Sequence, residues 1–301
     1  MSSFELVHSE IETLTEKAKK SSLSEFLQAL SSDRVNASQM AALLSPHGLS
    51  RLEQLAGQAR SVTLRRFGKV IQLYTPIYLS NYCQNDCTYC GFRRRNSITR
   101  KIQTPEMVEK EALFLKTEGF KNLLLVAGED PKVDVPYLTD TVQRLHRFTP
   151  SLAIEVAPKS LEEYKDIARS GAEGVVIYQE TYNQGLYKTY HGAGRKGDFA
   201  FRLKTPERIA RAGFHRLGAG VLLGLGDPVF DVLSLFTHIK YLLKNFWKLQ
   251  ITVSFPRIRK ADGAIDAPWI VDDKQFVQII CAFRLAFPDV GIVLSTREEP
   301  Y

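Results

Sequence analysis

Cysteine is scarce in this chain, which has only four among its 301 residues. So few cysteines in a chain of this length argue against a fold held together by disulfides. Long apolar runs are also missing, and the first 20 residues lack the short apolar core of a secretory signal. We therefore expect a cytoplasmic protein without a membrane span, whose 44% of hydrophobic residues build an ordinary core.

Acidic residues are outnumbered, because Lys and Arg total 40 against 33 for Asp and Glu, a formal net charge of +7. The basic residues are scattered, and no DNA- or RNA-binding signature accompanies them, so we expect no nucleic-acid partner. A basic balance suits small anionic substrates and acidic protein partners. The densest basic run, 93–95, predicts a solvated loop or a loop that contacts an anion.

The first part of the chain, residues 1–68, predicts a helical extension. Three segments in it (22–32, 36–45 and 50–68) carry apolar residues at helical spacing. Asn36 and Ser50 are the expected N-caps. No residue pattern in this extension indicates a catalytic or binding site.

From residue 69 to 301 the pattern changes to short apolar runs that alternate with amphipathic segments. Such runs are typical of parallel strands covered on both faces, and repeated β–α units favour an α/β fold, either a TIM-type parallel barrel or an open doubly wound sheet. We count seven strands instead of eight, so we expect a barrel that lacks its last strand. The expected strands are 70–80, 122–128, 152–158, 174–180, 217–225, 249–255 and 291–295.

Three of the four cysteines, Cys83, Cys87 and Cys90, directly follow the first expected strand. Three thiolates at the spacing C-x3-C-x2-C can hold three corners of an iron–sulfur cube from one loop, which leaves the fourth iron open. Zinc is the alternative, but structural zinc sites normally have four ligands, and no histidine follows Cys90 at a usable spacing. Cys281 lies in an apolar helical stretch, where a packed core thiol is expected.

This spacing, with Tyr89 just before the last cysteine, resembles the signature of the radical S-adenosylmethionine superfamily. The resemblance implies a [4Fe–4S] cluster whose open iron chelates S-adenosyl-L-methionine, and reductive cleavage of that cofactor to a 5′-deoxyadenosyl radical. It also implies that Tyr89 lies against the adenine.

Other cofactor contacts are implied at the carboxyl ends of strands. Gly128 and Glu129 follow Ala127 as a variant of the family's GGE motif and would contact the methionine amino group, although a plain strand-end turn is the alternative. Glu155 resembles the residue that holds the ribose hydroxyls. Arg202 resembles the arginine that pairs with the cofactor carboxylate, and a surface ion pair is its alternative.

From about residue 35 onward the chain resembles one family more closely, that of 2-iminoacetate synthase. The resemblance is carried by YLSNYCQNDCTYCGF, LLLVAGE, VVIYQETYNQGLY, FRLKTPERIARAGFHRLGAGVLLGL, VSFPRIR and LSTRE. It implies a lyase that cleaves the Cα–Cβ bond of free L-tyrosine to 2-iminoacetate (dehydroglycine) and 4-cresol for the thiazole of thiamine. Implied partners are thiazole synthase and a flavodoxin- or ferredoxin-type electron donor.

A tyrosine substrate needs an anchor for its carboxylate. The candidates are a group of four residues at the ends of the last two expected strands: Arg257, Arg259, Ser295 and Arg297. A salt bridge at the barrel rim is the alternative. Of Arg257 and Arg259 we expect only one to face the barrel mouth. Gln179, with Glu180 after it, could contact substrate or cofactor, or could be a hydrogen-bonded strand end.

Some features leave alternatives open. Members of this family usually continue for some tens of residues beyond LSTRE, so a truncated, inactive cluster-binding homologue is one alternative. Others are a tryptophan-cleaving lyase, the hydrogenase-maturation tyrosine lyase, whose second cluster needs further cysteines, and a zinc scaffold. The six histidines form no ligand pattern, and among them His191 is notable for lying in a family-like loop.

Overall fold

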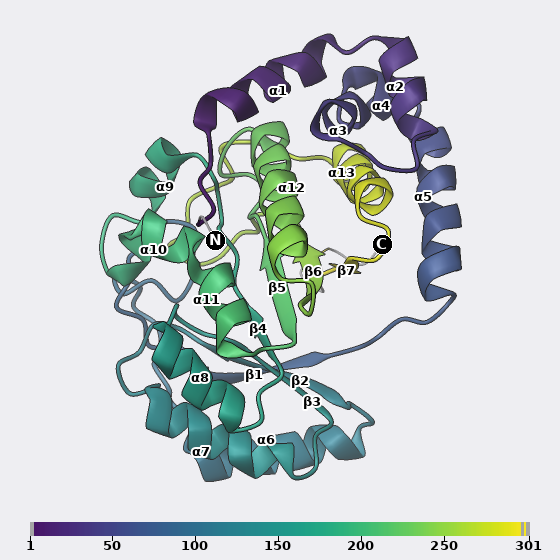
Figure 1. Cartoon of the computed structure of the whole chain (residues 1–301). Helices are drawn as coiled ribbons and strands as arrows, with labels where there is room; N and C mark the ends of the chain where they lie inside the picture. The colour runs from purple at the N-terminus through teal and green to yellow at the C-terminus, as the bar shows by residue number, and fades with distance from the viewer. Residues whose placement is uncertain (1–2, 296–297, 299–301) are drawn as a thin grey trace.

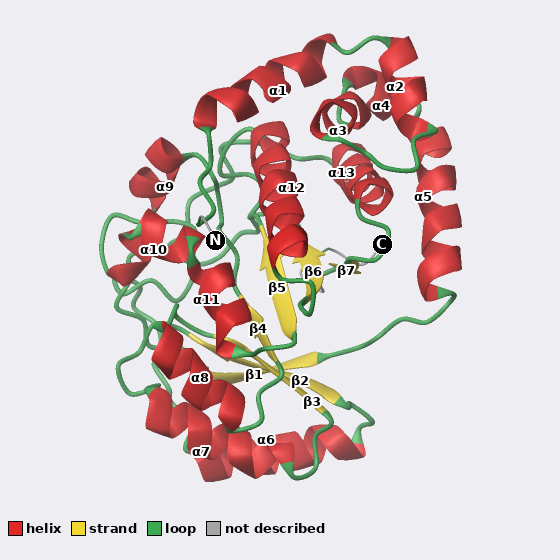
Figure 2. Cartoon of the chain, viewed as in Figure 1, coloured by secondary structure: helices red, strands yellow, loops and turns green. Residues whose placement is uncertain are grey.

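The computed structural model describes residues 3–295 and Glu298. Seven strands form one parallel sheet in which neighbours follow the chain order, and helices surround it (Figures 1 and 2). The strands are β1 (Thr75–Ser80), β2 (Asn122–Ala127), β3 (Ser151–Glu155), β4 (Gly174–Val176), β5 (Arg216–Gly220), β6 (Gln250–Ser254) and β7 (Gly291–Val293).

All seven expected strands are confirmed, each shorter than its apolar run. The run at 174–180 shows why: beyond β4 the chain still pairs with β5, since the backbone N–H groups of Ile177 and Gln179 donate to the carbonyls of Gly218 (2.8 Å) and Gly220 (3.0 Å). The apolar run thus continues into the loop at the carboxyl end of the strand, which is where ligand-binding residues gather in barrels.

Helices supply the outer layer and a long N-terminal arch. The helices are α1 (His8–Lys20), α2 (Leu23–Leu30), α3 (Ala37–Leu43), α4 (Pro46–Ser50), α5 (Leu52–Phe67), α6 (Pro105–Thr117), α7 (Val135–His146), α8 (Leu161–Arg169), α9 (Gln184–Tyr190), α10 (Phe199–Leu203), α11 (Thr205–Ala212), α12 (Pro228–Asn245) and α13 (Asp273–Ala286).

The core lies between the sheet and its helices. Inside it are fully buried strand residues such as Leu125, Ile154 and Val253, covered by helix residues such as Val142 and Ile239. Parallel strands with helices outside need apolar residues on both faces, which explains the continuous apolar runs of the sequence.

The N-terminal helices pack on the barrel helices mainly through α1, which contacts α12, and α5, which contacts α13. The side chain of Gln278 in α13 donates to the carbonyls of Leu43 and Ser45 (both 2.9 Å), which ties α13 to the end of α3. Asn36 is the N-cap of α3, as expected. The expectation for Ser50 is wrong, because the short helix α4, which Ser45 caps, ends at Ser50, and Arg51 precedes α5.

The sheet is a partial barrel. In the described part of the chain β1 and β7 are the two edges and do not pair with each other, as expected for a barrel without its last strand. A cavity of about 790 Å³ opens near the amino ends of the later strands, between α5 and α13, and Phe67, Arg216 and Phe287 are among its lining residues. Among the described residues, no helix is long and apolar enough to span a membrane.

Candidate active site

The three close cysteines lie in the loop that follows β1. Cys87 is buried, Cys83 and Cys90 are half-buried, and all three are free thiols. Backbone hydrogen bonds fix the loop: Gln84 donates to the carbonyl of Glu129 (3.0 Å), and Cys90 donates to that of Cys87 (3.1 Å). Backbone hydrogen bonds therefore set the shape of the loop that carries the three thiols.

The described residues show no ready-made site for a single metal ion. In the described part of the chain, no group of three or more His, Cys, Asp and Glu side chains is placed to hold a single metal ion. A zinc site needs such convergence, whereas an iron–sulfur cube takes one thiolate at each of several irons.

Burial controls the chemistry of Cys87. It raises the pKa of the Cys87 thiol to about 11; the positive charge of Lys196 opposes this rise, and the nearby Cys90 and Cys83 add to it. A thiolate at this position needs a strong positive charge beside it, as a bound metal centre supplies.

A second segment, Tyr190–Lys196, packs on the cysteine loop. Cys87 and His191 form an isolated antiparallel bridge. Thr88 donates to the carbonyl of Tyr190 (3.1 Å), so the two segments run together like a short ribbon. Gly194 has φ +85°, and a Cβ there would lie 2.1 Å from Asn85 Oδ1, so only glycine fits this close approach.

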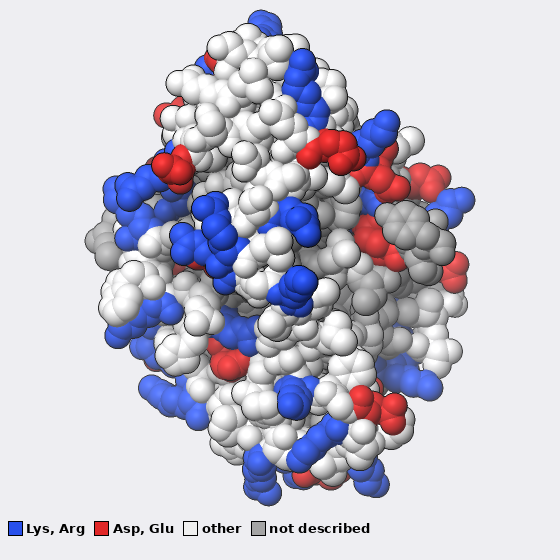
Figure 3. Space-filling model, turned by 90° about the vertical axis from the view of Figure 1, so that its right-hand side faces the viewer, with Lys and Arg blue, Asp and Glu red and all other residues white. Residues whose placement is uncertain are grey.

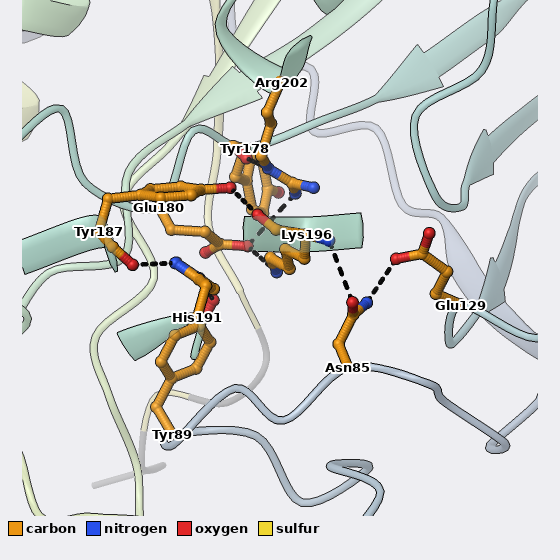
Figure 4. A network of polar contacts seen from close by, with 9 residues as sticks. All are labelled: Asn85, Tyr89, Glu129, Tyr178, Glu180, Tyr187, His191, Lys196 and Arg202. Atoms are coloured by element: carbon orange, nitrogen blue, oxygen red, sulfur yellow. Dashed lines mark hydrogen bonds and ion pairs between the residues drawn. The ribbon is translucent and has the colours of Figure 1, made fainter. Parts of the chain in front are cut away.

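Asn85 joins three parts of the site, as Figure 4 shows. Its Nδ2 donates to Glu129 Oε2 (2.5 Å), and its Oδ1 accepts from the backbone N–H of Lys196 (3.0 Å). Glu129 follows β2, where Gly128 donates to the carbonyl of Ser80 (3.0 Å). A Cβ on Gly128 would lie 2.3 Å from the carbonyl oxygen of Tyr82, so this glycine lets the cysteine loop close over the end of β2.

Beyond β4, a buried arginine and a partly buried lysine share one carboxylate. Lys196 Nζ lies 2.6 Å from Glu180 Oε1, and Arg202 Nη2 lies 3.4 Å from the same oxygen. Arg202 also donates through Nε to the carbonyl of Tyr178 (2.6 Å). Burial alone would raise the pKa of Glu180, but Lys196 and Arg202 more than offset it and lower that pKa. Burial alone would lower the pKa of Lys196, but the charge of Glu180 outweighs burial and raises that pKa to about 12.

This charged group is not balanced, since one carboxylate faces two cations whose side chains are only 17% (Lys196) and 9% (Arg202) exposed. Buried charge is costly without a partner, so the arrangement favours a further anion at this place. The alternative for Arg202, a surface ion pair, is wrong, because the residue is only 8% exposed. Glu180 has φ +71°, an uncommon backbone conformation for a residue other than glycine.

The remaining candidates lie around the same end of the sheet. Glu155 is the last residue of β3. Gln179 is buried, and its Nε2 has no hydrogen-bond partner. It lines a small cavity together with Arg202 and His238.

The hydroxyl of Tyr89 lies 2.7 Å from His191 Nε2, and His191 Nδ1 lies 2.7 Å from the carbonyl oxygen of Tyr187. Burial, together with the charge of Lys196, lowers the pKa of His191 to about 3, so the ring is neutral.

Arg257 and Arg259 both hold Glu298. Arg257 Nε lies 3.0 Å and Arg259 Nη2 2.5 Å from Glu298 Oε2, and Arg257 also pairs with Asp273 (2.7 Å). The expectation that only one arginine faces inward is wrong: the two follow the end of β6, and side chains two residues apart in an extended chain lie on the same side. Ser295 follows β7, and Arg297 lies outside the described residues.

Two residues of this network, Asn85 and Lys196, are not among the residues that the sequence singles out. Asn85 lies within the cysteine motif, so its position was a usable signal. Lys196 is one of 40 basic residues and carries no such signal. Basic side chains are spread over the face shown in Figure 3, with acidic ones among them, in agreement with the scattered pattern of the sequence.

Arg93 and Arg95 of the densest basic run pair with Asp86 of the cysteine loop (2.9 and 2.7 Å). This part of the run therefore braces the cysteine loop from outside, and the side chain of Arg95 stays mostly exposed.

Comparisons with known proteins agree with this geometry. The family model of the radical SAM superfamily matches residues 77–238, and that of the biotin and thiamin synthesis associated domain matches residues 254–301. The chain is 42% identical to the 2-iminoacetate synthase of Escherichia coli (strain K12) over 276 residues, which cover 91% of this chain and 73% of that protein.

Among solved structures, the chain resembles the [FeFe]-hydrogenase maturase HydG with a TM-score of 0.92 and 31% identity, over 97% of this chain and 68% of that one. For HydG from Carboxydothermus hydrogenoformans the TM-score is 0.88 and the identity 31%, over 98% and 72% of the two chains.

Proposed function

This chain belongs to the radical S-adenosylmethionine superfamily and, within it, to the family of 2-iminoacetate synthases, and we propose on this basis that it cleaves the Cα–Cβ bond of free L-tyrosine. The products would be 2-iminoacetate and 4-cresol, the former for the thiazole moiety of thiamine. The observation that carries the proposal is the 42% identity across 91% of the chain, together with a cysteine loop that lies near the pair of cations Lys196 and Arg202.

Superfamily members use a [4Fe–4S] cluster and S-adenosylmethionine, and the residues present fit both groups. Three free thiols lie on one backbone-fixed loop, and the fourth cysteine is buried in α13, away from that loop. We propose that Cys83, Cys87 and Cys90 hold the cluster. The excess positive charge of Lys196 and Arg202 over Glu180 fits the carboxylate of the cofactor.

When bound, these two groups supply the radical that removes a hydrogen atom from the amino group of the substrate. The chain itself binds, orients and excludes water. We propose that Tyr89 lies against the adenine and that Gly128 and Glu129 contact the methionine amino group. Glu155 would hold the ribose, and Arg202 the carboxylate.

For the substrate carboxylate, we propose the group formed by Arg257, Arg259, Ser295 and Arg297, with Gln179 as a further contact. Arg257 and Arg259 already converge on one carboxylate, that of Glu298. This geometry supports the idea that the two guanidinium groups can hold a carboxylate from two sides.

The reaction as a whole takes up two electrons and one proton, so an electron donor is part of the proposal. A flavodoxin- or ferredoxin-type protein would supply the electrons, and thiazole synthase would receive the imine. We also propose that residues 1–68 form a helical extension to a barrel domain of residues 69–301, since α1 to α5 all precede β1.

The test is an anaerobic assay of the reconstituted protein with dithionite, S-adenosylmethionine and tyrosine, in which 5′-deoxyadenosine and 4-cresol are measured together. We expect both products, their loss in Cys87→Ala, and their persistence in Cys281→Ala, the matched control for a cysteine outside the loop. Deoxyadenosine without cresol would overturn the tyrosine substrate. Neither product, from protein that holds its iron, would overturn the enzyme function and favour an inactive homologue.

The second candidate is a hydrogenase-maturation role, which the TM-score of 0.92 to HydG favours. The identity to HydG is 31%, against 42% to 2-iminoacetate synthase, and this difference favours the thiamine role.

A further inference from the structure

His191 is the buried histidine that the proposed chemistry leaves unused. It is 3% exposed, and its two ring nitrogens both have partners. Nδ1 lies 2.7 Å from the carbonyl oxygen of Tyr187, which can only accept, so Nδ1 carries the proton of the neutral ring. Nε2 then has a free lone pair and accepts from the hydroxyl of Tyr89 at 2.7 Å.

The contact fixes more than the hydroxyl. The rings of Tyr89 and His191 meet edge to face, with centroids 5.5 Å apart and planes at 86°. The imidazole in turn lies 4.0 Å from the ring of Tyr187. On the other side, Lys196 Nζ lies 5.5 Å from the centre of the Tyr89 ring. The plane of Tyr89 is therefore set by a hydrogen bond at its tip and by a cation near its ring (Figure 4).

The backbone of His191 is held as firmly as its side chain. It forms an antiparallel bridge with Cys87, and the residues on either side of it, Tyr190 and Ala193, accept from Thr88 (3.1 Å) and Asp86 (3.3 Å). His191 thus moves with the cysteine loop, and so it can act on Tyr89 without depending on a distant element.

From these contacts we propose that His191 is a positioning residue: its Nε2 holds the Tyr89 hydroxyl and thereby orients the Tyr89 ring for the adenine of S-adenosylmethionine. This inference rests on the proposed function, because it takes the adenine to lie on Tyr89. It assigns to His191 no contact with cofactor or substrate.

The test is a double-substitution cycle read by the affinity for S-adenosylmethionine, measured by equilibrium dialysis of iron-loaded protein. We expect Tyr89→Phe and His191→Phe each to weaken binding about tenfold, and the double variant to bind no worse than either single one, since both remove the same hydrogen bond. His191→Gln keeps an acceptor and should bind within about threefold of the unchanged protein. His215→Gln, at an exposed histidine before β5, is the control and should change nothing.

Several results would overturn the proposal. One is unchanged affinity in His191→Phe; another is a loss that is as large in the Tyr89→Phe background as in the unchanged protein, which would be the mark of a merely structural role. His191→Phe also removes the ring contact to the carbonyl of Tyr187, which then keeps only its hydrogen bond from the backbone N–H of residue 191 (3.1 Å). The same cycle is therefore also read by urea unfolding of the metal-free protein, where additive losses would contradict the hydrogen bond between Tyr89 and His191.

The outcomes separate this inference from the proposed function. Protein that cleaves S-adenosylmethionine but makes no cresol would end the tyrosine proposal and leave the cycle readable. Protein that never binds S-adenosylmethionine would end the proposed function, and with it the cofactor-orienting role of His191.

Discussion

Asn85 in the cysteine loop and Glu129 at the end of β2 are joined by a hydrogen bond of 2.5 Å from Asn85 Nδ2 to Glu129 Oε2. The same amide accepts from the backbone of Lys196 through Oδ1 (3.0 Å). One side chain thus ties together the loop of the cluster cysteines, the turn that would contact the methionine group, and the segment that carries a buried cation.

Asn85→Asp should therefore destabilise the protein. The substitution keeps the shape and the Oδ1 acceptor, but it turns the donor into a carboxylate that faces Glu129. We expect the free energy of unfolding to fall by about 1–3 kcal/mol, as measured by urea denaturation. Adding Glu129→Gln restores a donor opposite the acceptor and should recover at least half of the loss. A double variant that is as unstable as the sum of the two single ones would show that this hydrogen bond is not the cause.

The sequence predicts the outline of this site but not its connections. The spacing of Cys83, Cys87 and Cys90 is local, so it can be recognised without a structure. The partners of Asn85, in contrast, lie 44 and 111 residues away, at Glu129 and Lys196. Such contacts depend on which loops the barrel brings together, and no local pattern encodes them.

The seven strands follow from their apolar runs, but the conformation at their ends does not. Glu180 has a positive φ. A glycine would have indicated such a backbone conformation in the sequence, but a glutamate does not. The pair of Arg257 and Arg259 was misjudged for a different reason. The chain stays extended after Ser254, where Arg257 still bridges Leu223, and side chains two residues apart in an extended chain share a face.

Gly194→Ala and Gly192→Ala, two residues apart in one loop, should behave differently. Gly194 has φ +85°, and a Cβ there would lie 2.1 Å from Asn85 Oδ1, whereas a Cβ on Gly192 meets nothing within 4 Å. We expect Gly194→Ala to cost about 1–3 kcal/mol of stability and to lower the iron retained after reconstitution. Gly192→Ala should stay within about 0.5 kcal/mol. Equal losses of stability and iron in both variants would refute the close approach.

The N-terminal residues before α1 should contribute to barrel stability. Phe4 is 4% exposed, and its ring stacks on that of His238 in α12, with centroids 4.1 Å apart and planes at 3°. Its backbone N–H donates to Glu207 Oε1 (2.7 Å). Phe4→Ala should cost about 3 kcal/mol in urea unfolding, while Val7→Ala, at a residue that is 49% exposed, should cost under about 0.5 kcal/mol. If Phe4→Ala cost no more than Val7→Ala, the segment would be only loosely attached in solution.

Asp231 in α12 should make stability depend on pH. Its Oδ1 accepts from the hydroxyl of Thr181 (2.9 Å) and from the backbone N–H of Tyr182 (2.7 Å), and so it holds the loop just after Glu180. Burial raises the pKa of Asp231 to about 7, although these two hydrogen bonds oppose the rise. Because the folded protein binds this proton more tightly than the unfolded chain, the contribution is full below about pH 4 and is lost as the pH rises through about 7.

Asp231→Asn isolates this effect, since an asparagine keeps the Oδ1 acceptor and has no charge to bury. Between pH 5 and pH 8 we expect the variant to gain roughly 2–4 kcal/mol relative to the unchanged protein, as followed by urea unfolding across that range. Asp227→Asn is the matched control, because Asp227 caps the same helix by accepting from Val229 N–H (2.9 Å) and asparagine caps equally well. A stability difference that stays constant with pH would mean that Asp231 is ionised in the folded protein throughout this range, and that Thr181 and Tyr182 outweigh its burial.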